Sequence, residues 1–127
     1  MDIVAAAAAG DVATVTAYLE RGGDPDVRAD RGWTPLIAAA RNGHARMVDL
    51  LLAHGASPDL PNHNGTTPLM FAKTDAFGSG DLGIMERLVA AGADVNRRDN
   101  AGLTILHYTE TRAEKLVNFL RDLDAVR

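Results

Sequence analysis

The sequence predicts an all-α solenoid built from stacked helix-turn-helix units, because two phrases recur along it in step. The first phrase begins at Gly32, Gly65 and Gly102, and the second begins at Gly22, Gly55 and Gly92. In both series the glycines stand 33 and then 37 residues apart. Two markers that share a period of this length are typical of a protein made of stacked repeats.

The first helix of the second unit is predicted from local signals. Thr34 is a suitable N-cap, and Pro35 fits the first helical position, where its missing N–H does no harm. Leu36, Ala39 and Ala40 then form an apolar stripe at helical spacing. The Asn42-Gly43 pair predicts that this helix stops and the chain turns.

A second helix is predicted directly after this turn. Its broader apolar face contains Met47, Val48 and the leucines at 50–52. Gly55 ends it, because a residue without Cβ adopts the left-handed conformation of a helix C-terminus at little cost.

The phrases that carry these signals are Gly32-Trp33-Thr34-Pro35-Leu36, Gly65-Thr66-Thr67-Pro68-Leu69 and Gly102-Leu103-Thr104-Ile105-Leu106-His107. With them the chain resembles the ankyrin-repeat family, whose unit combines a β-turn, two antiparallel helices and a Thr-Pro-Leu-His phrase. The resemblance covers nearly the whole chain and implies a single domain over residues 1–127. It implies four repeats, at about 1–25, 26–58, 59–95 and 96–127, with atypical terminal repeats that act as caps.

The sequence departs from the family pattern in each unit. The histidine of the phrase is present only as His107, and Ile37 and Met70 replace it elsewhere. The first unit lacks the phrase and begins with Asp2 and an alanine-rich helix. The third unit carries about four extra residues near Ala76–Ser79, and the fourth loses about two between its helices.

Composition excludes several classes of protein. The chain has 127 residues and no cysteine, so neither a disulfide scaffold nor a thiol site is available. Its net charge of −4 argues against a nucleic-acid binder, which needs a clustered basic surface. The apolar N-terminal run has no basic region before it, and no stretch is long enough to span a bilayer. We therefore expect a cytoplasmic protein without a membrane partner.

Residues 78–83 spell G-x-G-x-x-G, a pattern found in dinucleotide-binding proteins. That site requires a preceding strand within a βαβ unit, and here a helix precedes the glycines. We interpret the segment as a turn between helices. Ser79 is not a nucleophile elbow, because Phe77 stands where that motif needs glycine.

The titratable residues do not form a catalytic or metal-binding pattern. No two of His44, His54, His63 and His107 have metal-ligand spacing on one helix face. The acidic residues recur at equivalent repeat positions, as in Asp24 and Asp94 or in Asp26, Asp59 and Asn96, which indicates turn chemistry. The sequence therefore predicts no catalytic residue, no cofactor and no metal.

Resemblance to the family implies that a partner is bound by the turn tips and the exposed side of the first helix of each unit. By repeat position these residues are Arg28, Asp30, Arg31, Trp33, Arg41, Asn42, Pro61, His63, Asn64, Thr66, Lys73, Thr74, Arg98, Asn100, Leu103 and Glu110. Five of them are basic and two are acidic, so one hypothesis is that the face recognises an acidic protein surface. The alternative is a solvated face without charge preference.

Two aromatic residues are further candidates for partner contact. Trp33, the single tryptophan, either packs on a neighbouring turn or anchors a partner, since tryptophan is enriched in interface hot spots. Phe77, in the inserted segment, is either tucked over the helices or offered to a partner. Long loops in compact repeats often carry function, so the segment is a candidate specificity element.

These observations predict a monomeric, non-enzymatic module for protein–protein interaction. One alternative is an inhibitor or immunity-type protein that blocks a partner enzyme. A second is a small enzyme that binds a nucleotide at residues 78–83, and a third is a structural repeat that self-associates through the region around Val117.

Overall fold

The computed structural model of the chain describes residues 2–72, 82–108 and 114–123. Those residues contain helices and loops and no β-strand. The helices are α1 (Ile3–Ala8), α2 (Val12–Glu20), the 3-10 turn η1 (Asp30–Gly32), α3 (Pro35–Arg41), α4 (Ala45–Ala53), the helical residues 68–72, α6 (Gly83–Ala90), α7 (Ile105–Tyr108) and α8 (Glu114–Asp122). The all-α class predicted from the repeat period is confirmed.

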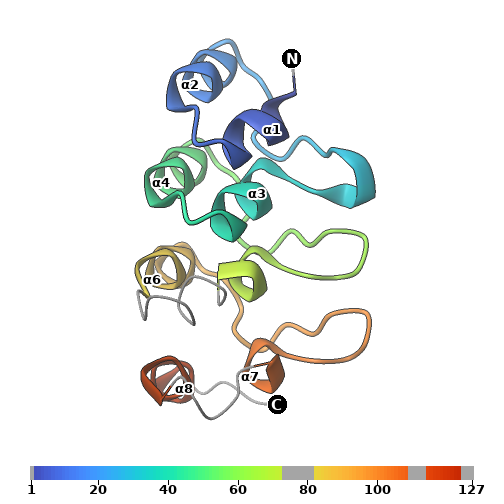
Figure 1. Cartoon of the computed structure of the whole chain (residues 1–127), viewed down its shortest axis with the longest axis vertical. Helices are drawn as coiled ribbons and strands as arrows, with labels where there is room; N and C mark the ends of the chain where they lie inside the picture. Colours follow the sequence, from blue (N-terminus) through green and yellow to red (C-terminus); the bar gives the residue numbers. More distant parts are fainter. Residues whose placement is uncertain (1, 73–81, 109–113, 124–127) are drawn as a thin grey trace.

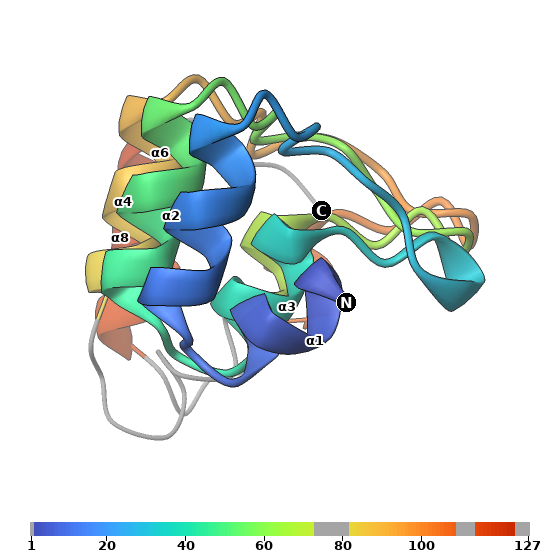
Figure 2. The same cartoon turned by 90° about the horizontal axis from the view of Figure 1, so that it is seen from above.

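The helices form two stacked layers (Figure 1). One layer holds α2, α4, α6 and α8, and the other holds α1, α3, residues 68–72 and α7. Loops 21–34, 54–67 and 91–104 project from the stack on the side of α1 and α3 (Figure 2). The inner helices and these loops together make the concave face of the solenoid.

The local signals of the second unit act as predicted. Thr34 is the N-cap of α3, and its buried Oγ1 accepts a hydrogen bond from the Ile37 N–H at 3.2 Å. Pro35 begins the helix, and Asn42 ends it before Gly43, whose φ is 74°. In the third unit the Thr67 Oγ1 accepts from the Met70 N–H in the same way, at 3.3 Å.

The core lies between the two helical layers. Both layers contribute to it: in the second unit, Ala39 of the inner helix α3 and Leu51 of the outer helix α4 are fully buried. Short inner-helix side chains let the layers approach closely, and α1 packs on α3 in the same way. Burial of this continuous apolar seam is what stabilises a stack of units that cannot fold alone.

The repeated acidic residues stabilise turns, as predicted, and they also connect successive units. The Asp24 Oδ1 accepts from the Asp26 N–H at 2.8 Å within one loop, which is an Asx-turn. The Asp26 Oδ1 then accepts from the Ser57 N–H of the next unit at 3.0 Å. Asp59 makes the equivalent bond to the Asp94 N–H at 2.8 Å. One carboxylate per unit therefore holds neighbouring loops in register.

Asp11, the N-cap of α2, makes the stability of the first unit depend on pH. Its carboxylate accepts from the Thr14 hydroxyl at 2.6 Å and from the Thr14 N–H at 3.2 Å. Both bonds favour the ionised form and lower the pKa of Asp11 from its ordinary value of 3.8. A lowered folded-state pKa contributes stability above pH 3.8, and this contribution is lost as the pH falls through the folded-state pKa.

We therefore expect Asp11→Asn to be less stable than the parent at neutral pH, with the difference shrinking below pH 4. Urea denaturation of both proteins between pH 7 and pH 3 measures it. A difference that stays constant over this range would contradict the assigned role of the Asp11 carboxylate.

Candidate functional site

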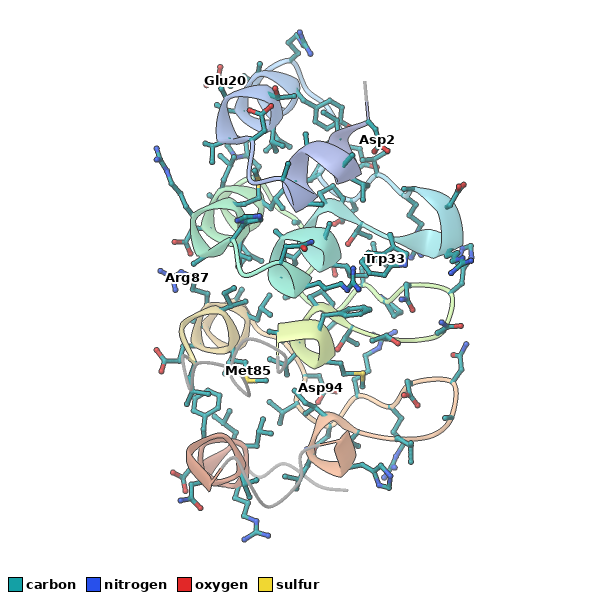
Figure 3. The ribbon with its side chains drawn as sticks, viewed as in Figure 1. Asp2, Glu20, Trp33, Met85, Arg87 and Asp94 are labelled. Atoms are coloured by element: carbon teal, nitrogen blue, oxygen red, sulfur yellow. The ribbon has the colours of Figure 1, made fainter. Side chains whose placement is uncertain are left out.

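A groove of about 530 Å³ lies on the concave face, between the inner helices of the first two units and the loop that joins them. The lining of the groove comes from α1 and its N-cap, from the end of α3, and from loop 21–34; it consists of Asp2, Val4, Ala5, Ala8, Ala29, Asp30, Trp33, Ala38, Arg41 and Asn42. Figure 3 labels two of these lining residues, Asp2 and Trp33. Residues far apart in the sequence thus share one surface because the units stack.

Trp33 connects the groove to the third unit. Its half-buried ring lies 5.0 Å from the Phe71 ring, centroid to centroid, with the two planes tilted by 43°. The Arg41 guanidinium sits 5.4 Å from the centroid of the Trp33 ring, within cation–π range. Trp33 therefore packs on Phe71 of the next unit, and part of its side chain remains exposed at the groove.

The other basic residues of the predicted face differ in their surroundings. Arg28 donates from Nη1 to the Pro61 carbonyl of the next loop at 3.1 Å. Arg98 donates to the Gly102 carbonyl within its own loop at 2.7 Å. Both side chains therefore support loop geometry while keeping their charge at the surface. Lys73, Thr74, Phe77 and Glu110 lie outside the described residues.

The loop tips are linked to one another by backbone and side-chain hydrogen bonds. The His63 N–H donates to the Arg31 carbonyl at 2.9 Å, and the Asn100 N–H donates to the Asn64 carbonyl at 3.0 Å. The Asn100 side-chain amide also donates to the His63 carbonyl at 2.8 Å. Arg31, His63, Asn64 and Asn100 are exposed, and these hydrogen bonds form a ladder that holds the loop tips in a row.

The tip of loop 21–34 has a strained backbone. Arg31 has φ 61° and ψ 17°, the left-handed region that a non-glycine residue rarely adopts. In the next loop the Asn62 Oδ1 accepts from the N–H groups of Asn64 and Thr66, at 2.9 and 3.1 Å. Ala29 is the equivalent residue of loop 21–34, and its side chain has no hydrogen-bond acceptor. The tip of loop 21–34 therefore forms the tighter η1 turn.

The histidines have structural or exposed positions. The His44 Nε2 lies 2.9 Å from the Ala8 carbonyl and so joins the first two units. The His54 Nδ1 lies 3.0 Å from the Leu50 carbonyl at the end of α4. Across residues 2–72, 82–108 and 114–123, no group of three or more His, Asp or Glu side chains could hold a metal ion.

The described part of the chain includes no helix long and apolar enough to cross a membrane. Most of the G-x-G-x-x-G segment lies outside the described residues. Of that segment, Leu82 is buried and Gly83 is the first residue of α6.

Sequence reasoning selected Asp30, Trp33, Arg41 and Asn42, and the structure brings these four together in the groove. It selected Arg31, His63, Asn64 and Asn100 as well, which lie together at the loop tips. It missed the contribution of the first unit, made by Asp2, Val4, Ala5 and Ala8. The positions of Ala5 and Ala8 on the inner helix of the first unit could have identified them as groove residues. They were missed because the first unit lacks the Thr-Pro-Leu phrase by which the other units are aligned.

Residues 3–99 match the protein-family model for ankyrin repeats in three copies. The match extends from α1 into loop 91–104 and covers more than half of the 127 residues. α7 and α8 follow the matched range and continue the two helical layers. A comparison with curated proteins found no match.

Proposed function

The chain belongs to the ankyrin-repeat family, and we propose that it is a non-enzymatic module that binds a partner protein through its concave face and loop tips. Repeats of this family generally mediate protein–protein interaction. The observation that carries the proposal for this chain is the groove on the concave face, with Trp33 half exposed on its wall. A solenoid presents such an extended surface to its partners.

The side chains of the groove suit protein recognition. Tryptophan and arginine are the residues most enriched in interface hot spots, and here Arg41 lies over Trp33. The contact with Phe71 restrains the Trp33 ring before a partner arrives. Less conformational entropy is then lost on binding, which favours affinity.

We further propose that the partner presents an acidic surface and that the protein acts as a monomer in the cytoplasm. The basic side chains Arg28, Arg31, Arg41 and Arg98 are all exposed on the loops or at the end of α3. Positive charge on the binding face of a protein with net charge −4 steers acidic partners toward that face.

Affinity capture from cells of the source organism, followed by mass spectrometry, tests the proposal and identifies the partner. Capture by the parent protein, with loss of capture by Trp33→Ala, supports binding at the groove. If the captured protein is an enzyme whose activity falls on addition of this chain, the module is an inhibitor. If no protein is enriched over a bead control, the proposed function is wrong.

Charge reversal of Arg31 and Arg41 to glutamate is expected to slow association with the captured partner about tenfold, because steering depends on the charge of the contacting face. The matched control reverses Arg46 and Arg121, which are exposed on α4 and α8 in the outer layer. Both double variants change the net charge equally. Stopped-flow or surface-plasmon association rates measure the effect, and equal rates for the two variants would remove the electrostatic part of the proposal.

A further inference from the structure

The loops between units each begin with a four-residue turn at equivalent positions. Residues 24–27 read Asp-Pro-Asp-Val, and residues 57–60 read Ser-Pro-Asp-Leu. The two turns differ chiefly in their first residue, because valine and leucine are both aliphatic. In loop 91–104 the first residue is Asp94. Ser57 therefore stands where the other two loops carry a carboxylate.

That carboxylate closes the turn in loops 21–34 and 91–104. The Asp24 Oδ1 accepts from the Asp26 N–H at 2.8 Å, and the Asp24 carbonyl accepts from the Val27 N–H at 3.3 Å. Asp94 makes the same two bonds, also at 2.8 and 3.3 Å, with the residues two and three positions later. An anionic side chain at the first position thus goes together with a well-formed turn.

The turn that begins at Ser57 lacks the side-chain bond. Among the described residues no side chain accepts from the Asp59 N–H, and the backbone bond from Leu60 to Ser57 does not reach the geometry of its two counterparts. The Ser57 hydroxyl also has no hydrogen-bond partner in this part of the chain, and the side chain is half buried. A neutral hydroxyl is a weaker partner for this N–H than a carboxylate.

An anion at residue 57 is compatible with the neighbouring unit. The Ser57 N–H donates to the Asp26 Oδ1 at 3.0 Å, so a carboxylate already lies close by. The Asp94 N–H donates to the Asp59 Oδ1 at 2.8 Å in the same way, and there the Asp94 side chain is itself a carboxylate. Two acidic side chains therefore stand together at one junction between units, and repulsion does not exclude the same arrangement at the other.

Ser57 also has local features that suit the acceptor of a transferred group. Pro58 follows it, and the residue before a proline is held extended. Ser57 lies in a loop outside any helix, and its hydroxyl can react without breaking a bond to a described residue. Because this turn lacks one closing bond, local opening costs less here than at Asp24 or Asp94.

We propose that Ser57 is a phosphorylation site and that the phosphate closes this turn. The Ser57 Oγ bonds to the γ-phosphorus of a nucleoside triphosphate held by a protein kinase, the nucleoside diphosphate leaves with the electrons of the broken P–O bond, and the hydroxyl proton passes to a kinase carboxylate. The phosphate carries about −1.5 to −2 charges and has acceptor oxygens, one of which takes the Asp59 N–H. Since this turn also makes the bonds to Asp26 and Asp94, phosphorylation strengthens both junctions of loop 54–67 with its neighbours.

Phosphopeptide mapping by mass spectrometry, on the protein isolated from cells of the source organism, tests whether the site is used. We expect phosphate on the peptide that contains Ser57. Expressed in the same cells, Ser57→Ala is expected to lose this phosphate, and Ser79→Ala, which changes the other serine of the chain, is expected to retain it. A native protein that carries no phosphate on Ser57 would overturn the proposal.

The full chain with phosphoserine incorporated at residue 57 tests the role of the phosphate. We expect a higher urea midpoint than that of the parent, and amide hydrogen exchange about tenfold slower at Asp59, as for one bond to a charged acceptor. Ser57→Asp is expected to shift both quantities in the same direction by less. Unchanged exchange at Asp59, or a midpoint at or below that of the parent, would show that the phosphate does not close the turn.

Asp24→Ser is the matched control, because it gives loop 21–34 the Ser-Pro-Asp sequence of loop 54–67. We expect it to lower the urea midpoint and to speed amide exchange at Asp26, which loses its side-chain acceptor. Phosphoserine at residue 24 is expected to reverse both changes. If Asp24→Ser leaves the midpoint and the exchange as in the parent, the anion at this position does not stabilise the turn and the proposal fails.

Discussion

Replacement of Gly65 by alanine is expected to lower the free energy of unfolding by about 3 kcal/mol, because it combines a backbone penalty with a steric clash. Gly65 has φ 77°, a left-handed conformation that costs an alanine about 1–2 kcal/mol. An added Cβ would also stand 2.7 Å from the backbone nitrogen of Asn100 in the next loop. A backbone atom cannot move aside as the end of a side chain can, so the loop-tip ladder must open.

Gly102 offers a matched control for this experiment. It occupies the equivalent turn position with φ 80°, and an added Cβ there has no atom within 4 Å among the described neighbours. Gly102→Ala has the same cost of a left-handed alanine as Gly65→Ala but no steric clash. Alanine also stiffens the unfolded chain, which offsets about 0.4–1 kcal/mol of that cost. We therefore expect the free energy of unfolding to fall by about 1 kcal/mol. Urea denaturation followed by circular dichroism measures both variants, and equal losses would show that the close approach of the loops contributes nothing.

Leu51→Ala is expected to cost about 2–5 kcal/mol, as for other fully buried leucines. Leu51 has no exposed surface and lies on α4, which contacts α2, α3 and α6. A cavity at this place weakens the packing of the second unit against both of its neighbours. Because a repeat protein is stabilised by its interfaces between units, the loss is expected to affect the cooperativity of unfolding as well.

Leu52→Ala is the matched control for Leu51→Ala. Leu52 is the next residue of the same helix and is half buried, so both changes alter helix propensity equally. We expect its loss to be less than half of that at Leu51, because less apolar surface leaves the core. Urea denaturation of both variants gives their free energies of unfolding and their m-values. Similar losses of unfolding free energy at Leu51 and Leu52 would contradict the two-layer core.

Local sequence signals predicted much of the fold because they act over a few residues. The Thr34-Pro35 pair started α3, Asn42 and Gly43 ended it, and the same start signals recur at Thr67 and Pro68 in step with the repeated glycines. Capping and turn formation are settled by the backbone conformations that each residue permits. The period then favours stacking, because a unit of two short helices cannot bury its apolar face alone.

The sequence predicted the groove only in part. Asp30, Trp33, Arg41 and Asn42 were found because their repeat positions lie on the exposed side of the units. Phe71 was not connected with Trp33, although it stands in its unit where Ala38 stands in the preceding one. The change from a small side chain at Ala38 to a large one at Phe71 could have indicated the contact between Phe71 and Trp33.

By itself the sequence determined the all-α class, the repeat period and the positions at which the two helices of the second unit begin and end. Only the tertiary structure decided that Asp2 and Arg41 share one groove, that Asp26 holds the loop containing Ser57, and that Gly65 lies against Asn100. The physical reason is the range of the interactions. Caps and turns join residues two to four apart, whereas these contacts join residues more than thirty apart, and they exist only after the units have stacked.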